Sequence, residues 1–463
     1  MHQSLRNLVI FSFFILAVSA SPEPQSFKCP TYIDTVVPSG QNRFYGKREP
    51  GDPFLATMQD VHATLFKCSN ITSLKLRVTG LGCSEWPDRW SFPFDLRSGS
   101  HYPSKLEALD LEGYQFNDSP WAEVQESPVH SQSVILRNLE WAASERGWKW
   151  LKWLTLSQEQ KAKTSLDLWL DAMDFGHIKT LSLRLARDHT PNLERLIPHL
   201  KSLRSLAVSG TWAKDLILGL PENSLTHLSW ISSGETGESV QPALLRHAQS
   251  LTSLEWREPE SEYRQRKVMS AEQIAEVGRA IPGLQSISLD INRNGTWPME
   301  HFEALATNFP KVKNMTIFLE FASECRRQLE TSKLGVVKNF HRYDMERETE
   351  CKGRASMAQP LLNNHRAEKV FDFLREKKVG DELTKVVFYA GDWQRPWDGP
   401  LAESTWLESR KAFYLCEVTD EPVSWDIAGS GHTRCEGLNT ELVGDHHPGW
   451  GEDLAKRAAN FEL

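Results

Sequence analysis

One short apolar pattern recurs along the middle of the chain and restricts the possible folds more than any other feature of the sequence. Each copy reads apolar-x-x-apolar-x-apolar, and its last two apolar residues are two positions apart, as on a β-strand that buries one face. The copies are Ile71/Leu74/Leu76, Leu106/Leu109/Leu111, Ile178/Leu181/Leu183, Leu203/Leu206/Val208, Leu225/Leu228/Trp230, Leu251/Leu254/Trp256, Leu284/Ile287/Leu289, Val312/Met315/Ile317 and Leu383/Val386/Phe388. The pattern therefore predicts a series of short strands.

Helical stretches lie between several of these copies. Ser270-Ala271-Glu272-Gln273 forms a capping box, which opens a predicted helix that ends before Pro282. Residues 165–174, 240–249 and 298–309 show similar helical patterns. Each unit is thus predicted to consist of a helix, a tight stop and a short strand.

A single helix and strand cannot bury an apolar face alone, but stacked units share a continuous core. We therefore predict an α/β solenoid with a curved parallel sheet and outer helices. Its expected parts are a signal peptide at residues 1–20, an N-terminal cap at 21–67 and a repeat array at 68–345. A last repeat and a C-terminal cap follow at 346–463.

Two stretches carry a family resemblance. SNITSLKLRVTGLGCSEWPDRW, from residue 69, and LWLDAMDFGHIKTLSL, from residue 168, resemble a group of uncharacterised secreted fungal proteins. The repeats are similar to the longer, irregular leucine-rich repeats of F-box-type repeat proteins. The resemblance implies a leucine-rich-repeat solenoid over roughly residues 27–440 and implies no activity. The Asn that typically follows the strand is mostly absent, as at Leu203–Gly210, so the curvature is expected to be irregular.

The start of the chain predicts secretion. Residues 8–18, LVIFSFFILAV, follow Arg6 and precede the small residues Val18-Ser19-Ala20. This order is typical of a signal peptide cleaved after Ala20. The apolar run is shorter than the roughly 20 residues of a membrane helix, so we expect no membrane span and an extracellular or cell-wall location.

The seven cysteines are expected to pair in an oxidising compartment. Neighbouring cysteines suggest the bridges Cys325–Cys351 and Cys416–Cys435. Cys29 is expected to pair with either Cys68 or Cys83, which leaves one odd thiol.

Four N-glycosylation triplets agree with secretion. They begin at Asn70, Asn117, Asn294 and Asn314. Each is a candidate glycosylation site.

Side chains between the apolar strand positions are expected to form the concave face of the sheet. The charged candidates are Lys75, Arg77, Asp110, Glu112, Arg184, Glu255, Arg257 and Asp290. Their mixed sign suits a protein or glycan partner. The alternative is a solvated sheet face that binds nothing. With 53 Lys and Arg against 61 Asp and Glu, no basic field favours nucleic acid.

Two tryptophan loops flank the repeats. Trp86, Arg89 and Trp90 follow the first predicted strand, and Trp393, Arg395 and Trp397 follow the last. We favour a role in covering the ends of the solenoid, because a solenoid exposes an apolar edge there. Sugar stacking on exposed rings is the alternative.

The sequence holds no GxSxG, HExxH or P-loop motif. We therefore predict a protein without catalytic residues, cofactor or metal. The expected function is a secreted binding protein that presents its repeat surface to an extracellular protein. The alternatives are a glycan-binding or cell-wall-associated protein and a secreted hydrolase.

Overall fold

The computed structural model describes residues 29–37, 55, 58–78, 92–94, 101–103, 105–114, 116, 120, 156–184, 192–258, 260, 266–323, 357–391, 412–419 and 432–439. Within these ranges, one sheet runs through the molecule with its strands in sequence order. The predicted signal peptide, both tryptophan loops, Cys83, Cys325, Cys351 and Asn117 lie outside them.

The sheet has twelve strands within the described ranges, and its central part is parallel. The strands are β1 (Tyr32–Val37), β2 (Ser73–Val78), β3 (Ala108–Glu112), β4 (Thr180–Arg184), β5 (Ser205–Ser209), β6 (His227–Ile231), β7 (Ser253–Arg257), β8 (Ser286–Ile291), β9 (Asn314–Leu319), β10 (Lys385–Ala390), β11 (Ala412–Thr419) and β12 (His432–Asn439). Strands β1 to β10 are parallel to their neighbours, whereas β10, β11 and β12 are antiparallel. Strands β2 to β10 coincide with the copies of the repeat, which confirms the predicted strand positions.

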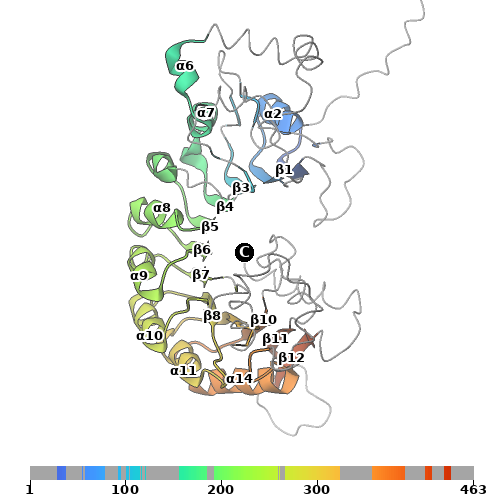
Figure 1. The fold of residues 1–463 in the computed structure, drawn as a ribbon, viewed down its shortest axis with the longest axis vertical. Helices are drawn as coiled ribbons and strands as arrows, with labels where there is room; N and C mark the ends of the chain where they lie inside the picture. Colours follow the sequence, from blue (N-terminus) through green and yellow to red (C-terminus); the bar gives the residue numbers. More distant parts are fainter. Residues whose placement is uncertain are drawn as a thin grey trace, which may run out of the picture.

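Helices alternate with these strands. They are α2 (Met58–Lys67), α6 (Gln158–Ala162), α7 (Ser165–Ala172), α8 (Ala213–Gly219), α9 (Gly237–Leu245), α10 (Ala271–Ala280), α11 (Met299–Asn308) and α14 (Asn364–Lys377), with 3-10 turns η2 (Phe175–His177) and η3 (Leu193–His199). Helices α8 to α14 follow the outer side of an arc whose inner side is formed by the strands (Figure 1). Ser270 caps α10 with the predicted capping box, because its hydroxyl accepts the Gln273 N–H and the Gln273 side chain accepts the Ser270 N–H.

Two rows of apolar side chains cross the sheet on its outer face and form the core. One row is Leu74, Leu109, Leu181, Leu206, Leu228, Leu254, Ile287, Met315 and Val386, and each of these residues is at most 2% exposed. The second row runs two positions later and includes Trp230 and Trp256. Full burial of one such side chain contributes about 1.5–3 kcal/mol, so the two rows supply most of the cohesion between units.

A ladder of backbone hydrogen bonds fixes the spacing of the units where the strands begin. The N–H of Arg204 donates to Lys179 O at 2.9 Å, that of Thr226 to Arg204 O at 2.8 Å, and that of Thr252 to Thr226 O at 2.8 Å. The same contact joins Gln285 to Thr252 at 2.7 Å. Equivalent residues of successive units therefore lie side by side.

Both ends of the described sheet differ from a plain repeat. At the N-terminal end, β1 continues the parallel sheet, and a disulfide joins Cys29 to Cys68, which decides between the two partners expected for Cys29. At the C-terminal end, the disulfide between Cys416 and Cys435 confirms the predicted bridge and joins residues that face each other on β11 and β12. The expected Cys325–Cys351 bridge stays a prediction, since both cysteines lie outside the described ranges.

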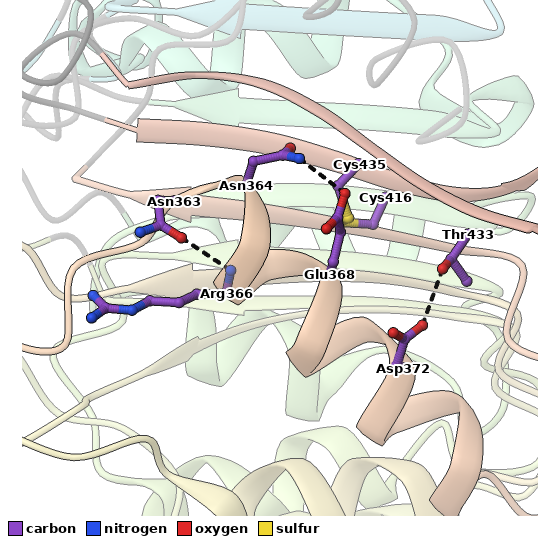
Figure 2. Close-up of a disulfide and its surroundings, with 8 residues drawn as sticks. All are labelled: Asn363, Asn364, Arg366, Glu368, Asp372, Cys416, Thr433 and Cys435. Carbon is purple, nitrogen blue, oxygen red and sulfur yellow. Dashed lines mark hydrogen bonds between the residues drawn. A yellow bond between two sulfur atoms is a disulfide. The ribbon is translucent and has the colours of Figure 1, made fainter.

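Helix α14 packs beside this bridged ribbon (Figure 2). The Asn363 side chain caps the helix by accepting the Arg366 N–H at 3.0 Å. The Thr433 hydroxyl of β12 donates to Asp372 of the helix at 3.1 Å. Helix, ribbon and disulfide thus close the C-terminal end of the described sheet. Within the described ranges, no helix is long and apolar enough to span a membrane.

Gly278 provides a test of the contact between α10 and α11. A Cβ at this position would lie 2.7 Å from Asn308 O and 2.9 Å from Asn308 Cβ. Gly278→Ala should lower the free energy of unfolding by about 1–3 kcal/mol through overpacking, although alanine is the better helix former by about 1 kcal/mol. Urea denaturation measures the change.

Gly283→Ala is the matched control for this substitution. Its Cβ would meet only Leu251 O, at 3.6 Å, which is an ordinary contact. The control should change the free energy of unfolding by less than about 0.5 kcal/mol. A stabilising Gly278→Ala would contradict the packing of α10 against α11.

Candidate functional site

Polar side chains occupy much of the inner face of the sheet, at the strand positions that alternate with the apolar core residues. Neighbouring strands bring the predicted residues into register. Lys75 of β2 lies opposite Asp110 of β3. In the next row Arg77 lies opposite Glu112, and Glu112 opposite Arg184 of β4. The repeat pattern thus gathers residues that are up to about a hundred positions apart.

Six of these side chains alternate in sign over β1 to β4, and we call them the N-terminal charge lattice: Asp34, Lys75, Arg77, Asp110, Glu112 and Arg184. Arg77 Nε lies 3.0 Å from Glu112 Oε1, and these two side chains are 19% and 20% exposed. Arg184 Nη2 lies 3.5 Å from Asp110 Oδ2. Each arginine thus has a carboxylate beside it on the same face.

Partial burial shifts the pKa values of two groups of the lattice. It raises the pKa of Asp34, and the neighbouring Lys75 opposes that shift. It lowers the pKa of Lys75, and Asp34 and Asp110 oppose that shift. With three acids and three bases, the lattice compensates its own charge and produces little field at a distance.

Small side chains on β5 and β6 and a glutamate on β7 continue the inner face. Ser205, Ala207 and Ser209 of β5 are half-buried, and so are Ser229 of β6 and Glu255 of β7. The Ser229 hydroxyl donates to Glu255 Oε2 at 2.6 Å. Together with five residues of the lattice, these residues form what we call the open inner face: Lys75, Arg77, Asp110, Glu112, Arg184, Ser205, Ala207, Ser209, Ser229 and Glu255.

Arg257 and Asp290 do not belong to this surface, so the expectation that they lie on an exposed face is wrong. They are 0% and 2% exposed. Arg266, from the chain that follows β7, donates to Asp290 Oδ1 at 2.9 Å and covers that carboxylate. The Arg257 guanidinium stacks over the Phe318 ring, 3.2 Å from its centroid. Polar residues still alternate with apolar residues along these strands, but other residues cover the polar side chains.

These two residues form part of a buried ion network that spans the carboxyl ends of β6 to β9. Its members are the buried residues Arg257, Glu260, Arg266, Asp290, Arg293 and Glu320, together with the half-buried Glu258. The carboxylates accept backbone N–H groups from neighbouring units, as Glu258 does from Gly234 at 3.0 Å and Glu320 does from Arg293 at 2.9 Å. Carboxylates thus satisfy the backbone amides of turns in neighbouring units.

Burial shifts the pKa of Asp290 and that of Arg293 in opposite directions. It raises the pKa of Asp290, and Arg266 and Arg257 oppose that shift. It lowers the pKa of Arg293 to about 10, against the attraction of Glu320 and Glu260. A buried charge of this kind is stable only while its partners stay in place.

Aromatic and aliphatic side chains cover the inner face beyond the network. Phe318 stacks on Tyr389 with centroids 4.8 Å apart, and Tyr389 contacts Phe413 at 5.1 Å. Val387 and Leu415 complete this buried cluster. The inner face is therefore half exposed over much of β2 to β7, apart from the buried Ser182, Ile231 and Arg257. From β8 to β11 it is buried beyond the strand starts, where Ser286 and Asn314 are half-buried.

Sequence reasoning missed five members of the network: Glu258, Glu260, Arg266, Arg293 and Glu320. A signal exists for two of them, because Glu258 and Glu320 are acids placed directly after β7 and β9. The other three come from the segments that connect strands, whose path the repeat pattern does not define.

The remaining candidates fall into two groups. Asn70 and Asn294 are exposed, whereas Asn314 is half-buried within β9. The aromatic loop residues Trp86, Arg89, Trp90, Trp393, Arg395 and Trp397, together with Asn117, lie outside the described ranges and stay predictions. In the part of the chain that the structure describes, no three His, Cys, Asp or Glu side chains are grouped so as to hold a metal ion.

Comparison with protein-family models, with curated proteins and with solved structures found no match for this chain.

Asp290→Asn tests whether the network depends on its buried charge. Removing one partner from a buried ion pair typically costs about 3–5 kcal/mol, because the other charge is left buried. We expect a loss of that size in the free energy of unfolding, measured by urea denaturation. Glu107→Gln is the control, because the Lys179–Glu107 pair at 3.0 Å is more than half exposed on both sides and should contribute about 1 kcal/mol or less. Equal losses in the two variants would contradict a buried network.

Proposed function

We propose that this protein is a secreted, non-catalytic binding protein of leucine-rich-repeat type, and that its open inner face binds an extracellular protein. One observation carries the proposal. The ten side chains of the open inner face remain half exposed on the parallel strands β2 to β7, whereas Arg257, Asp290 and the cluster around Phe318 are buried. The resemblance to secreted fungal repeat proteins supports the secretion and the repeat architecture.

The geometry of the open inner face favours recognition of a partner through direct short-range contacts. Side chains on strands are held more firmly than side chains on loops, so they present a fixed pattern of donors and acceptors. The pattern combines short hydroxyls, such as Ser205 and Ser209, with charges that already have partners on the same face. Since the N-terminal charge lattice compensates itself, we expect a partner with a polar, nearly neutral surface and an association rate that depends weakly on salt.

Secretion is supported by two independent features. The first 20 residues have the order of a signal peptide. The bridges Cys29–Cys68 and Cys416–Cys435 are of a kind that persists in oxidising compartments.

Ala207→Arg tests the binding surface. Ala207 is half-buried and lies beside Ser229 of the open inner face, with the buried Ser182 on its other side. An arginine at this position would occupy the surface and keep a partner away. Partners are captured from secreted material on the wild-type protein, and each captured protein is then purified and titrated by surface plasmon resonance. We expect at least a tenfold loss of affinity for Ala207→Arg. Glu303→Arg, on the exposed side of α11, should bind as the wild type does.

Three outcomes would contradict the proposal. Equal binding by wild type and Ala207→Arg would place the partner on another surface. Glycan-array binding that is lost in Trp90→Ala would favour a glycan-binding protein. Turnover of a substrate by the purified protein would favour a secreted hydrolase.

A further inference from the structure

The three described glycosylation triplets lie in different environments. The triplet at Asn294 forms an exposed turn after β8, in which the Thr296 N–H donates to Arg293 O at 2.9 Å. Asn294 and Gly295 have φ values of 46° and 85°, and a Cβ built on Gly295 would meet nothing within 4 Å. Asn294 is thus exposed on a turn whose backbone is held by the bond from its N–H to Glu320 Oε1 at 2.9 Å.

The triplet at Asn70 is also in a turn, between α2 and β2. Asn70 and Thr72 are both exposed, while Ile71 between them is buried in the core. Cys68, two residues earlier, is bridged to Cys29 and anchors this turn. The anchored turn holds the Asn70 side chain outward.

The triplet at Asn314 is part of β9 and faces the inner side of the sheet. Asn314 is half-buried and in register with Ser286 of β8 and Lys385 of β10. Thr316 and Lys385 are each only 6% exposed. A glycan on Asn314 would have to stand where other residues already cover the sheet.

We propose that Asn70 and Asn294 carry N-linked glycans in the mature protein and that Asn314 carries none. The assignment rests on the proposed secretion. In the transfer, the amide Nδ2 loses a proton and bonds to C1 of a sugar, as the bond from C1 to the pyrophosphate oxygen of a lipid-linked oligosaccharide breaks. The donor is the oligosaccharide pyrophosphate lipid of the secretory pathway.

The two sites lie on opposite edges of the sheet. Asn70 precedes the start of β2, whereas Asn294 follows the end of β8, and parallel strands place their starts along one edge and their ends along the other. Neither glycan stands on the open inner face. The glycans therefore border the proposed binding surface without covering it.

Expression in a eukaryotic secretory host tests the assignment, in an Asn117→Gln background that removes the fourth triplet. One form keeps the native residues 1–20, and a second form replaces them with a leader known to direct secretion. Intact-glycopeptide mass spectrometry measures the occupancy of each asparagine. We expect two glycans, and each should be lost in its own variant, Asn70→Gln or Asn294→Gln. Asn314→Gln should lose the same mass on deglycosylation as the Asn117→Gln background protein does.

The two forms separate the failure of the assignment from the failure of secretion. If only the form with the replaced leader is glycosylated at Asn70 and Asn294, the site assignment holds and the proposed secretion is wrong. If that form carries a glycan on Asn314, or none on Asn70 or Asn294, the site assignment is wrong whatever the native leader does.

Discussion

Burial of two apolar rows across successive strands is the interaction on which the remaining structure depends. A unit such as β6 with its helix has too little apolar surface for a core of its own, so it is stable only between its neighbours. The rows place Leu228 against Leu206 and Leu254, and they place Trp230 against Val208 and Trp256. The same register brings Arg77 beside Glu112 on the opposite face, so the inner surface is a consequence of the core.

The inner face serves two purposes in its two parts. Over β8 to β11 it is sealed by charges and aromatic rings, and a buried ion network is maintained only with its hydrogen bonds satisfied. Carboxylates of the network take the turn amides of adjacent units, so they stiffen the carboxyl ends of β6 to β9. Over β2 to β7 the ten residues of the open inner face remain half exposed, and they form the part that we propose binds a partner. The glycans proposed at Asn70 and Asn294 leave this part accessible.

The parts of the fold that follow directly from a local sequence pattern could be predicted. Alternation of apolar residues placed β2 to β10, and the Ser270 capping box placed the start of α10. Strands β11 and β12 were not predicted, because antiparallel strands outside the repeat share none of its pattern. For the candidate site, alternation identified Lys75, Arg77 and Asp110 as inner-face residues, but it assumed that nothing covers such a face. Arg257 and Asp290 contradict that assumption, since Arg266 reaches them from a connecting segment whose path no periodicity defines.

The division of the inner face into an open and a sealed part is the central claim, and carboxyl footprinting of the native protein tests it most directly. A water-soluble carbodiimide with an amine label modifies accessible carboxylates, and peptide mass spectrometry gives the rate at each. We expect Glu255, on the open part, to be labelled readily, while Asp290 and Glu260, at 2% and 5% exposure, stay protected until the protein unfolds. Labelling of Asp290 at the rate of Glu255 in the folded protein would contradict this division.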